Sequence, residues 1–229
     1  MTQESVLQNN HQKISKKDRN VPSRKEREKQ TRQHEILSSA KKLFLEKGYH
    51  RTTLEEIAQH AEFGKGTIYN YFSSKEELFF GILNSLAEEA HKIAESSINI
   101  SGNVHDKFTS YAMGLISYAE VNSDIFQLII QEMHNLNSSE NDAKLRGLRK
   151  RYTNVIRLLA ELITDEIKKK NVRKLDPLKL AKLFDSMVQF FCVNHFGPHK
   201  IDKVDNIDDE VALMVSVFFN GISEPKAKG

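Results

Sequence analysis

Residues 52–72 read TTLEEIAQHAEFGKGTIYNYF, and this stretch predicts two short helices joined by a tight turn. In its first half, apolar residues stand at positions i, i+3 and i+4, which is the spacing of one helix face. These residues are Leu54, Ile57 and Ala58. Thr52 and Thr53 each stand three residues before a glutamate, so either can form the capping box that begins the first helix. Gly64 and Gly66 then break the pattern.

The second helix of this stretch turns Ile68 and Phe72 inward, at i and i+4. Two short helices joined by a tight turn form a helix-turn-helix, whose second helix has the size to enter the major groove of B-DNA. The side chains predicted to reach base edges are Thr67, Tyr69 and Asn70. An Asn can pair with adenine, and a Thr can offer its methyl group to thymine. For Tyr69 and Tyr71, packing against the helix predicted at about 24–47 is the alternative.

This stretch and its flanks, from about residue 27 to about residue 86, resemble the DNA-binding signature of the TetR family of bacterial regulators. The resemblance lies in Gly48-Tyr49, Thr52-Thr53, Ile57-Ala58, Gly64 to Phe72 and Ser74 to Leu78. It implies a set of phosphate contacts, some of them from backbone amides at helix N-termini. These contacts fall on Thr52, Thr53, Lys65, Gly66, Tyr71 and Lys75. Asn70 stands where the family varies most, so we expect it to choose the sequence.

The turn departs from the family pattern. Where the family usually has Gly-Val-Ser, this chain has Glu62-Phe63-Gly64. A left-handed backbone costs a residue other than glycine about 1–2 kcal/mol. We therefore expect strain at Glu62.

Composition indicates an ordinary soluble chain of 229 residues, with 39% hydrophobic and 28% charged residues, enough for one large or two small domains. The net charge of +3 gives little indication of whether the protein binds nucleic acid, but the distribution of charge along the chain is more informative. Between residues 13 and 29, eight basic residues face three acidic ones. The basic residues are Lys13, Lys16, Lys17, Arg19, Arg24, Lys25, Arg27 and Lys29. This run is either a solvated tail or an electrostatic footprint for DNA.

Several classes of protein are not expected. Cys192 is the single cysteine, so an internal disulfide or a cysteine zinc site is excluded. No apolar run has the length of a membrane span or forms a signal core, which predicts a cytoplasmic protein without membrane contact. His195 and His199 have a helical metal spacing, but Gly197-Pro198 stands between them, so we expect no metal. No catalytic constellation or cofactor motif is present, so an enzyme is not expected.

The whole chain has helical periodicity, which predicts an all-α fold of about nine helices. The predicted helices cover about 24–47, 54–61, 65–71, 75–96, 104–120, 123–134, 142–170, 177–196 and 208–220. The predicted domain organisation is a disordered basic arm (1–22), a three-helix DNA-binding domain (23–74), a helical ligand-binding and dimerisation domain (75–221) and a tail (222–229). The helix that begins after Ser74 is longer than the first domain requires, so we expect it to link the two domains mechanically.

The last two helices are apolar on more than one stripe. Phe190-Phe191 and Phe218-Phe219 point in successive directions, so each helix is either central or part of an interface. The family resemblance implies that these two helices pair with their copies in a dimer. Two recognition helices about 34 Å apart, or a multiple of that distance, match a palindromic operator. Burial within one subunit is the alternative.

A pocket for a small ligand is expected between the helices of the second domain. The candidate lining residues are Phe108, Met113, Phe126, Met133, Tyr152, Phe184, Met187, Phe191 and Cys192, although each could be plain core. The leading hypothesis is a homodimeric repressor that a small apolar ligand releases from a palindromic operator. The alternative is a DNA-binding dimer whose second domain docks a protein partner or is purely structural.

Overall fold

The computed structural model describes residues 23–136, 142–197 and 206–223. Across these ranges the regular structure is helical, apart from one isolated bridge between Val172 and Ser223. The helices are α2 (Arg24–Lys47), α3 (Leu54–His60), α4 (Lys65–Tyr71), α5 (Lys75–Ile98), α6 (Val104–Val121), α7 (Ser123–Leu136), α8 (Asp142–Lys168), α9 (Pro177–Phe196) and α10 (Ile207–Ile222). The predicted all-α fold and number of helices are confirmed over the described ranges. The predicted arm (1–22) and most of the tail lie outside them.

Helix boundaries follow local capping signals. Ser23 caps α2 and forms a capping box with Glu26, and Asp176 caps α9 just before a proline at its first position. Thr53 rather than Thr52 caps α3, with Glu56 as its partner in the box. The predicted bounds match the observed ones or differ from them by one or two residues; α8, for example, ends at Lys168 instead of Lys170.

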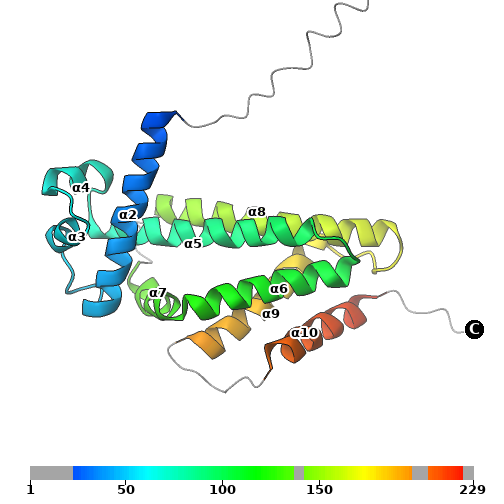
Figure 1. The fold of residues 1–229 in the computed structure, drawn as a ribbon. Helices are drawn as coiled ribbons and strands as arrows, with labels where there is room; N and C mark the ends of the chain where they lie inside the picture. Colours follow the sequence, from blue (N-terminus) through cyan, green and yellow to red (C-terminus); the bar gives the residue numbers. More distant parts are fainter. Residues whose placement is uncertain (1–22, 137–141, 198–205, 224–229) are drawn as a thin grey trace, which may run out of the picture.

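The helix-turn-helix lies at one end of the molecule, against α2 and the start of α5 (Figure 1). Its hydrophobic core, which we call the N-terminal cluster, gathers buried residues of α2, α3, α4 and α5. It also takes Ile125 and Leu128 from α7 and Leu145 from α8. Two helices of the second domain therefore help to hold the DNA-binding end in place.

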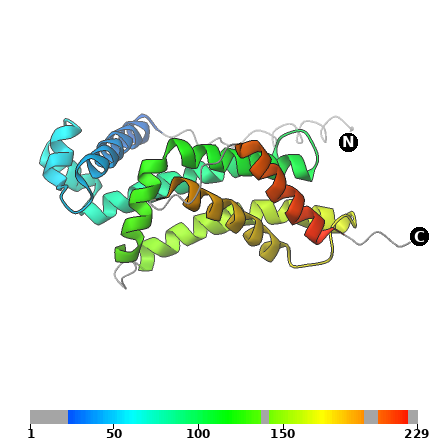
Figure 2. The same ribbon diagram turned by 90° about the horizontal axis from the view of Figure 1, so that it is seen from below.

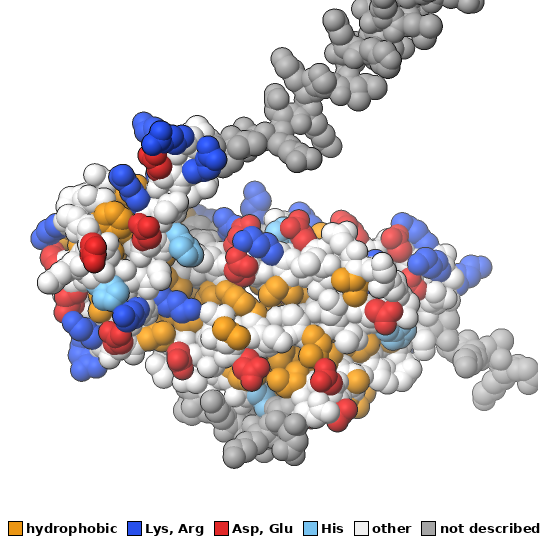
Figure 3. Space-filling view, in the orientation of Figure 1, with side chains coloured by type: hydrophobic (Ala, Val, Ile, Leu, Met, Phe, Trp, Pro, Cys, Tyr) orange, Lys and Arg blue, Asp and Glu red, His pale blue; other side chains and the backbone are white. Residues whose placement is uncertain are grey.

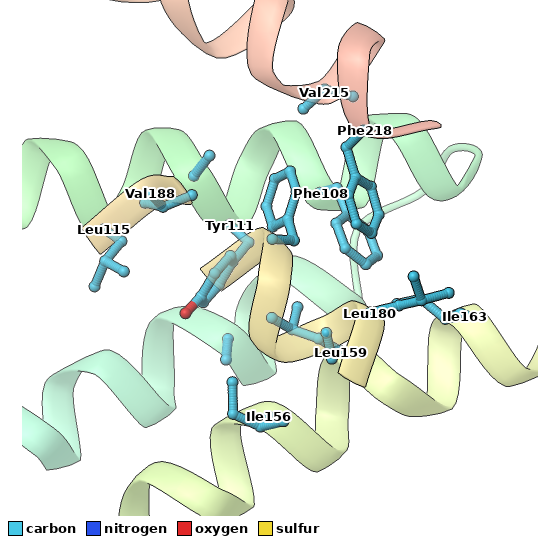
Figure 4. Close-up of a cluster of buried hydrophobic side chains, with 14 of the residues drawn as sticks. Phe108, Tyr111, Leu115, Ile156, Leu159, Ile163, Leu180, Val188, Val215 and Phe218 are labelled. Atoms are coloured by element: carbon cyan, nitrogen blue, oxygen red, sulfur yellow. The ribbon is translucent and has the colours of Figure 1, made fainter. Parts of the chain in front are cut away.

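The second core, which we call the C-terminal cluster, is formed mainly by α6, α8, α9 and α10. Figure 4 shows its centre, where Phe108 and Tyr111 of α6 meet Leu159 of α8 and Phe218 of α10. The rings of Phe108 and Phe184 lie edge to face with their centroids 4.8 Å apart, a favourable aromatic geometry. α5 packs along both α6 and α8, so one helix joins the two clusters.

α9 and α10 lie on the same side of the C-terminal body (Figure 2). Phe218 and Phe219 are both buried, so the apolar stripes that they form are covered within one subunit. Phe191 is buried as well, whereas Phe190 is 70% exposed. The expectation of two apolar faces is thus correct for both helices, but the residues that stay uncovered on α10 are Leu213 and Val217 rather than its phenylalanines.

Candidate DNA interface and ligand pocket

α4 presents most of its surface to solvent. Among its residues only Ile68 is buried, and Phe72 closes the core just after the helix ends. Tyr69 is 44% exposed, Asn70 is exposed and Thr67 is half-buried. The three predicted base-reading residues therefore share a helix that is anchored from one side only. Such a helix can enter a groove without disturbing the core that holds it.

The turn between α3 and α4 contains the predicted strain. Glu62 has φ +58°, in the left-handed region, directly after the end of α3. The amide of Phe63 donates to the carbonyl of Ala58 at 2.9 Å, and the amide of Glu62 donates to that of Gln59 at 3.2 Å. This pair of bonds is a Schellman motif, in which glycine is the usual residue at the left-handed position.

An acidic residue of α3 holds two of the candidate DNA contacts. Lys65 Nζ lies 2.5 Å from Glu55 Oε1, and the hydroxyl of Tyr69 donates to the same oxygen at 3.4 Å. The hydrogen bond from Lys65 lowers the pKa of Glu55, so the carboxylate is ionised at neutral pH. Because all three side chains are exposed, a phosphate can replace the carboxylate as the partner of Lys65.

The remaining candidate phosphate contacts differ in their exposure to solvent and in the partners that they already have. Thr53 is exposed, and its amide and hydroxyl are engaged by Glu56. Lys75 Nζ donates to the carbonyl of His50 at 3.0 Å and lies 4.6 Å from the centroid of the Tyr49 ring. A Cβ added to Gly66 would meet no atom within 4 Å, so the space above this residue is open.

Thr52 does not fit its predicted role. Its side chain is 1% exposed, and its hydroxyl donates to the carbonyl of Gly48 at 2.9 Å. The threonine pair is thus divided between the inside and the outside, and of the two only Thr53 has a side chain exposed to solvent. Tyr71 is half-buried and packs against the N-terminal cluster, which includes buried residues of α2.

The first turns of α2 add positive charge beside the motif. Arg24, Lys25, Arg27 and Lys29 are all exposed there. In Figure 3, several Lys and Arg side chains lie at this end of the molecule, and others lie at the opposite end of the C-terminal body. The described half of the basic run is therefore placed next to the candidate DNA interface, as an electrostatic footprint requires.

A cavity of about 250 Å³ lies between α5, α6, α7, α8 and α9. Three of the predicted lining residues belong to it, namely Phe126, Tyr152 and Cys192. The others described here do not line it. Phe108 and Phe184 are fully buried in the C-terminal cluster, and Met113, Met187 and Phe191 pack within or against that cluster. Phe108, Phe184 and Phe191 are core residues because each lies on the face of its helix that meets the other helices, whereas the two methionines are only half-buried. The side chain of Met133 lies outside the described residues.

Sequence reasoning missed the polar part of this cavity, which Tyr111, Tyr118, Asp185 and Gln189 contribute. Asp185 is 1% exposed. It accepts hydrogen bonds from the hydroxyl of Tyr111 at 2.5 Å and from Gln189 Nε2 at 2.6 Å. A signal was present, because Asp185 stands four residues after Ala181 and three before Val188, both of which are buried. An acid on the buried face of a helix is uncommon.

Burial shifts the titration of the groups around this cavity. It raises the pKa of Asp185, although the hydrogen bonds that the carboxylate accepts oppose this shift. Burial also raises the pKa of the Cys192 thiol to about 12, which keeps the thiol protonated and unreactive. His195 Nδ1 lies 2.8 Å from the carbonyl of Phe191 within its own helix, and the described residues contain no cluster suited to a metal ion.

A second hollow, of about 630 Å³, lies at the opposite end of the C-terminal body, between the start of α6, the end of α8 and α10. Its wall includes the buried acid Glu166, which is paired with Lys169 at 2.8 Å. Two of the three buried acids among the described residues thus differ, since Glu166 has a cation beside it and Asp185 has neutral partners.

The arrangement defines a class of protein. An exposed, polar recognition helix in a helix-turn-helix, a basic flank and a helical body with a cavity are the features of a DNA-binding regulator of transcription. Over the described residues, no helix is both long and apolar enough to cross a membrane.

Comparisons with known proteins identify the family. The sequence profile described as bacterial regulatory proteins, tetR family, matches residues 36–82. The uncharacterised HTH-type transcriptional regulator YhgD of Bacillus subtilis is 29% identical over 169 residues, which cover 66% of this chain and 81% of that protein. The uncharacterised regulator YuxN of the same organism is 47% identical over 49 residues, covering 21% of this chain and 17% of its own.

Among solved structures, a TetR-family transcriptional regulator from Mesorhizobium loti has a TM-score of 0.68 at 20% identity, covering 89% of this chain and all of that one. The chain therefore has the DNA-binding domain of the tetR family of bacterial regulatory proteins in residues 36–82, and it is similar to transcriptional regulators over most of its length. It is a DNA-binding transcriptional regulator and not an enzyme.

Proposed function

We propose that this protein is a homodimeric repressor that leaves a palindromic operator when a small molecule enters the cavity of its second domain. In this proposal residues 23–74 bind DNA, residues 75–221 bind the ligand and dimerise, and the protein acts in the cytoplasm. The observation that carries the proposal is the pairing of two surfaces in one chain, an exposed polar recognition helix and an exposed apolar face on α9 and α10.

The apolar face supports dimerisation. Leu183 and Phe190 are 55% and 70% exposed and stand seven residues apart, on one side of α9. Leu213 and Val217 of α10 are 59% and 56% exposed and stand four residues apart. Large apolar side chains grouped in this way mark an interaction site. A second copy is the partner that we propose, because a palindromic operator needs two recognition helices related by a two-fold axis.

Two helices support coupling between the cavity and the DNA. The first turns of α5 belong to the N-terminal cluster, and its residues Leu86, Ala87 and Ala90 line the cavity further along. α7 inserts Ile125 and Leu128 into the N-terminal cluster, while Phe126 lines the cavity. A ligand that moves either helix therefore also moves the base of the helix-turn-helix. The coupling must be reciprocal, so operator DNA weakens ligand binding by the same factor.

For the DNA contacts, we propose that Thr67, Tyr69 and Asn70 read bases. Phosphates are bound by Thr53, Lys65, Gly66 and Lys75, with a smaller part for the half-buried Tyr71. Phosphate contacts set the register on the duplex, and base contacts choose the sequence.

The test is selection of binding sites from random duplexes by the purified full-length protein, repeated with Asn70→Ala. We expect a short palindrome that becomes degenerate at one position in each half-site when Asn70 is replaced. Lys168→Ala, far from the interface on α8, is the matched control and should leave the selected palindrome unchanged. Binding that depends on salt but not on sequence would contradict the proposal, because phosphate contacts alone give that behaviour.

A further inference from the structure

We propose that the cavity between α5 and α9 selects a small organic cation, with Asp185 as the group that recognises its positive charge. This inference rests on the ligand control proposed above and names the chemical class of the ligand. Three features of the described residues carry it, namely a buried acid without a cationic partner, an aromatic wall and an opening to solvent.

The first feature is the isolation of the acid. Asp185 is 1% exposed, and its hydrogen-bond donors, Tyr111, Gln189 and Tyr152, are uncharged. None of the ion pairs formed among the described residues includes Asp185. A buried charge normally has a counter-charge, because desolvation is costly. The contrast with Glu166 is direct, since that buried acid has Lys169 at 2.8 Å. A ligand cation would supply the counter-charge that the chain does not provide.

The second feature is the remaining wall. Tyr111, Tyr118, Phe126 and Tyr152 bring four aromatic rings to a cavity that, apart from Asp185 and Gln189, is otherwise formed by small and aliphatic side chains. The faces of aromatic rings attract cations, most strongly where water is excluded. Figure 4 shows the Tyr111 hydroxyl directed away from Phe108 and Phe218, on the far side of the ring from the packed phenylalanines. The same ring thus belongs to the core and carries the hydroxyl that holds Asp185.

The third feature is access and size. Tyr152 is 38% exposed and Val193 is 46% exposed, and both line the cavity, so a ligand can enter beside them. A volume of about 250 Å³ is slightly below the usual range for drug-sized ligands, which indicates a compact molecule. A carboxylate ligand of the same size would place like charges together, so the acid also excludes anions.

The experiment uses three probes with similar apolar bodies and different charges. Benzyltrimethylammonium is the cation, neopentylbenzene is its uncharged carbon isostere and phenylacetate is an anion. Calorimetric titration of the full-length protein should give an affinity for the cation at least about tenfold above that for the isostere, and no measurable binding of phenylacetate. This order of affinities tests the inference without any variant.

Asp185→Asn tests the role of the residue, because the amide keeps an oxygen that can accept from Tyr111 and removes the charge. The preference for the cation over the isostere should fall to near one, while the affinity for neopentylbenzene stays within about twofold. Glu166→Gln removes a buried charge from the same domain at the other hollow and should keep the full preference. A preference that survives Asp185→Asn, or tighter binding of phenylacetate than of the cation, overturns the inference.

The failure of this inference can be told apart from failure of the proposed function. Operator binding is measured with each probe present. If neopentylbenzene releases the operator and the cation does not, ligand control stands and cation selection falls. If no probe binds, the cavity is not the ligand site and both fall. If the cation binds and releases the operator through Asp185, both are supported.

Discussion

α4 and α9 expose opposite kinds of surface. The recognition helix buries Ile68 alone and turns its polar side chains outward, whereas α9 buries one stripe and still leaves Leu183 and Phe190 uncovered. Neither surface is needed to fold a single chain, because the two hydrophobic clusters are complete without them. Surfaces that exceed the needs of folding point to partners, and their chemistry supports the partners that we propose: DNA for the polar helix and a second apolar face for α9.

The largest effect is expected from breaking the apolar surface. Phe190→Glu places a charge at the centre of the exposed face of α9 without touching either core, so the chain should fold and remain monomeric. Loss of the second recognition helix should weaken operator binding by at least about a hundredfold, because the second half-site contact is then no longer intramolecular. Sedimentation velocity gives the oligomeric state, and fluorescence anisotropy gives the operator affinity.

Val121→Glu is the matched control for this prediction. Val121 is 84% exposed at the end of α6 and belongs to neither α9 nor α10, so the same change of chemistry there should alter neither property. If the Phe190→Glu protein is still a dimer, the interface between copies lies elsewhere, and the main support for the apolar face as that interface is lost.

The next effect is expected at Gly66, where stability and binding should move in opposite directions. Alanine at this position meets no atom of the protein within 4 Å and is a better helix former, so the free energy of unfolding should rise by up to about 1 kcal/mol. If the backbone approaches a phosphate here, the added methyl group should weaken operator binding by about tenfold. Thermal unfolding and anisotropy titration measure the two quantities on one sample. Unchanged operator affinity would show that the DNA backbone stays away from Gly66.

A smaller effect is expected at Glu55, which competes with DNA for Lys65 and Tyr69. Glu55→Gln removes the negative charge that lies 2.5 Å from Lys65 Nζ, so the lysine becomes available to a phosphate. Exposed ion pairs contribute little, and we therefore expect a gain in operator affinity of only about twofold to fivefold. Titrations at several salt concentrations measure it, and Glu161→Gln on α8 controls for the change in net charge. Weaker binding by Glu55→Gln would mean that the carboxylate positions Lys65 instead of competing for it.

The same comparison explains how much of the molecule could be predicted from its sequence. Helix bounds, the helix-turn-helix and the strained turn were predictable because capping boxes, glycines and helical spacing act within a few residues. The residues that line the cavity were not predictable. Helical periodicity identifies the buried face of a helix, but it does not show which residues of that face line a cavity and which pack against other side chains. Phe108 and Phe126 look alike in sequence, yet one is core and the other lines the cavity. Spacing could not distinguish Thr52 from Thr53, because the difference between them is that the Thr52 side chain is buried and the Thr53 side chain is exposed.

The smallest effect is expected on stability, at two turns, one in each domain. Glu62 after α3 and Lys170 after α8 have φ of +58° and +62°, and both close a Schellman motif without the usual glycine. A left-handed backbone costs these residues about 1–2 kcal/mol. Glycine avoids this cost, but it loses more conformational freedom on folding, which offsets about 0.5–1 kcal/mol of the gain. Glu62→Gly and Lys170→Gly should therefore each raise the free energy of unfolding by up to about 1 kcal/mol.

Chemical denaturation measures both variants, with alanine at each position as the control that keeps the strain and should give no gain. If Lys170→Gly stabilises the protein and Glu62→Gly does not, the side chain of Glu62 makes a compensating interaction in the turn between the two helices of the motif. The left-handed glutamate would then be part of how the recognition helix is set, because the strain would be offset by a contact that glycine cannot make. Equal gains at both positions would instead mean that the glutamate only adds strain to the turn, and that α4 keeps its orientation through Ile68 and Phe72.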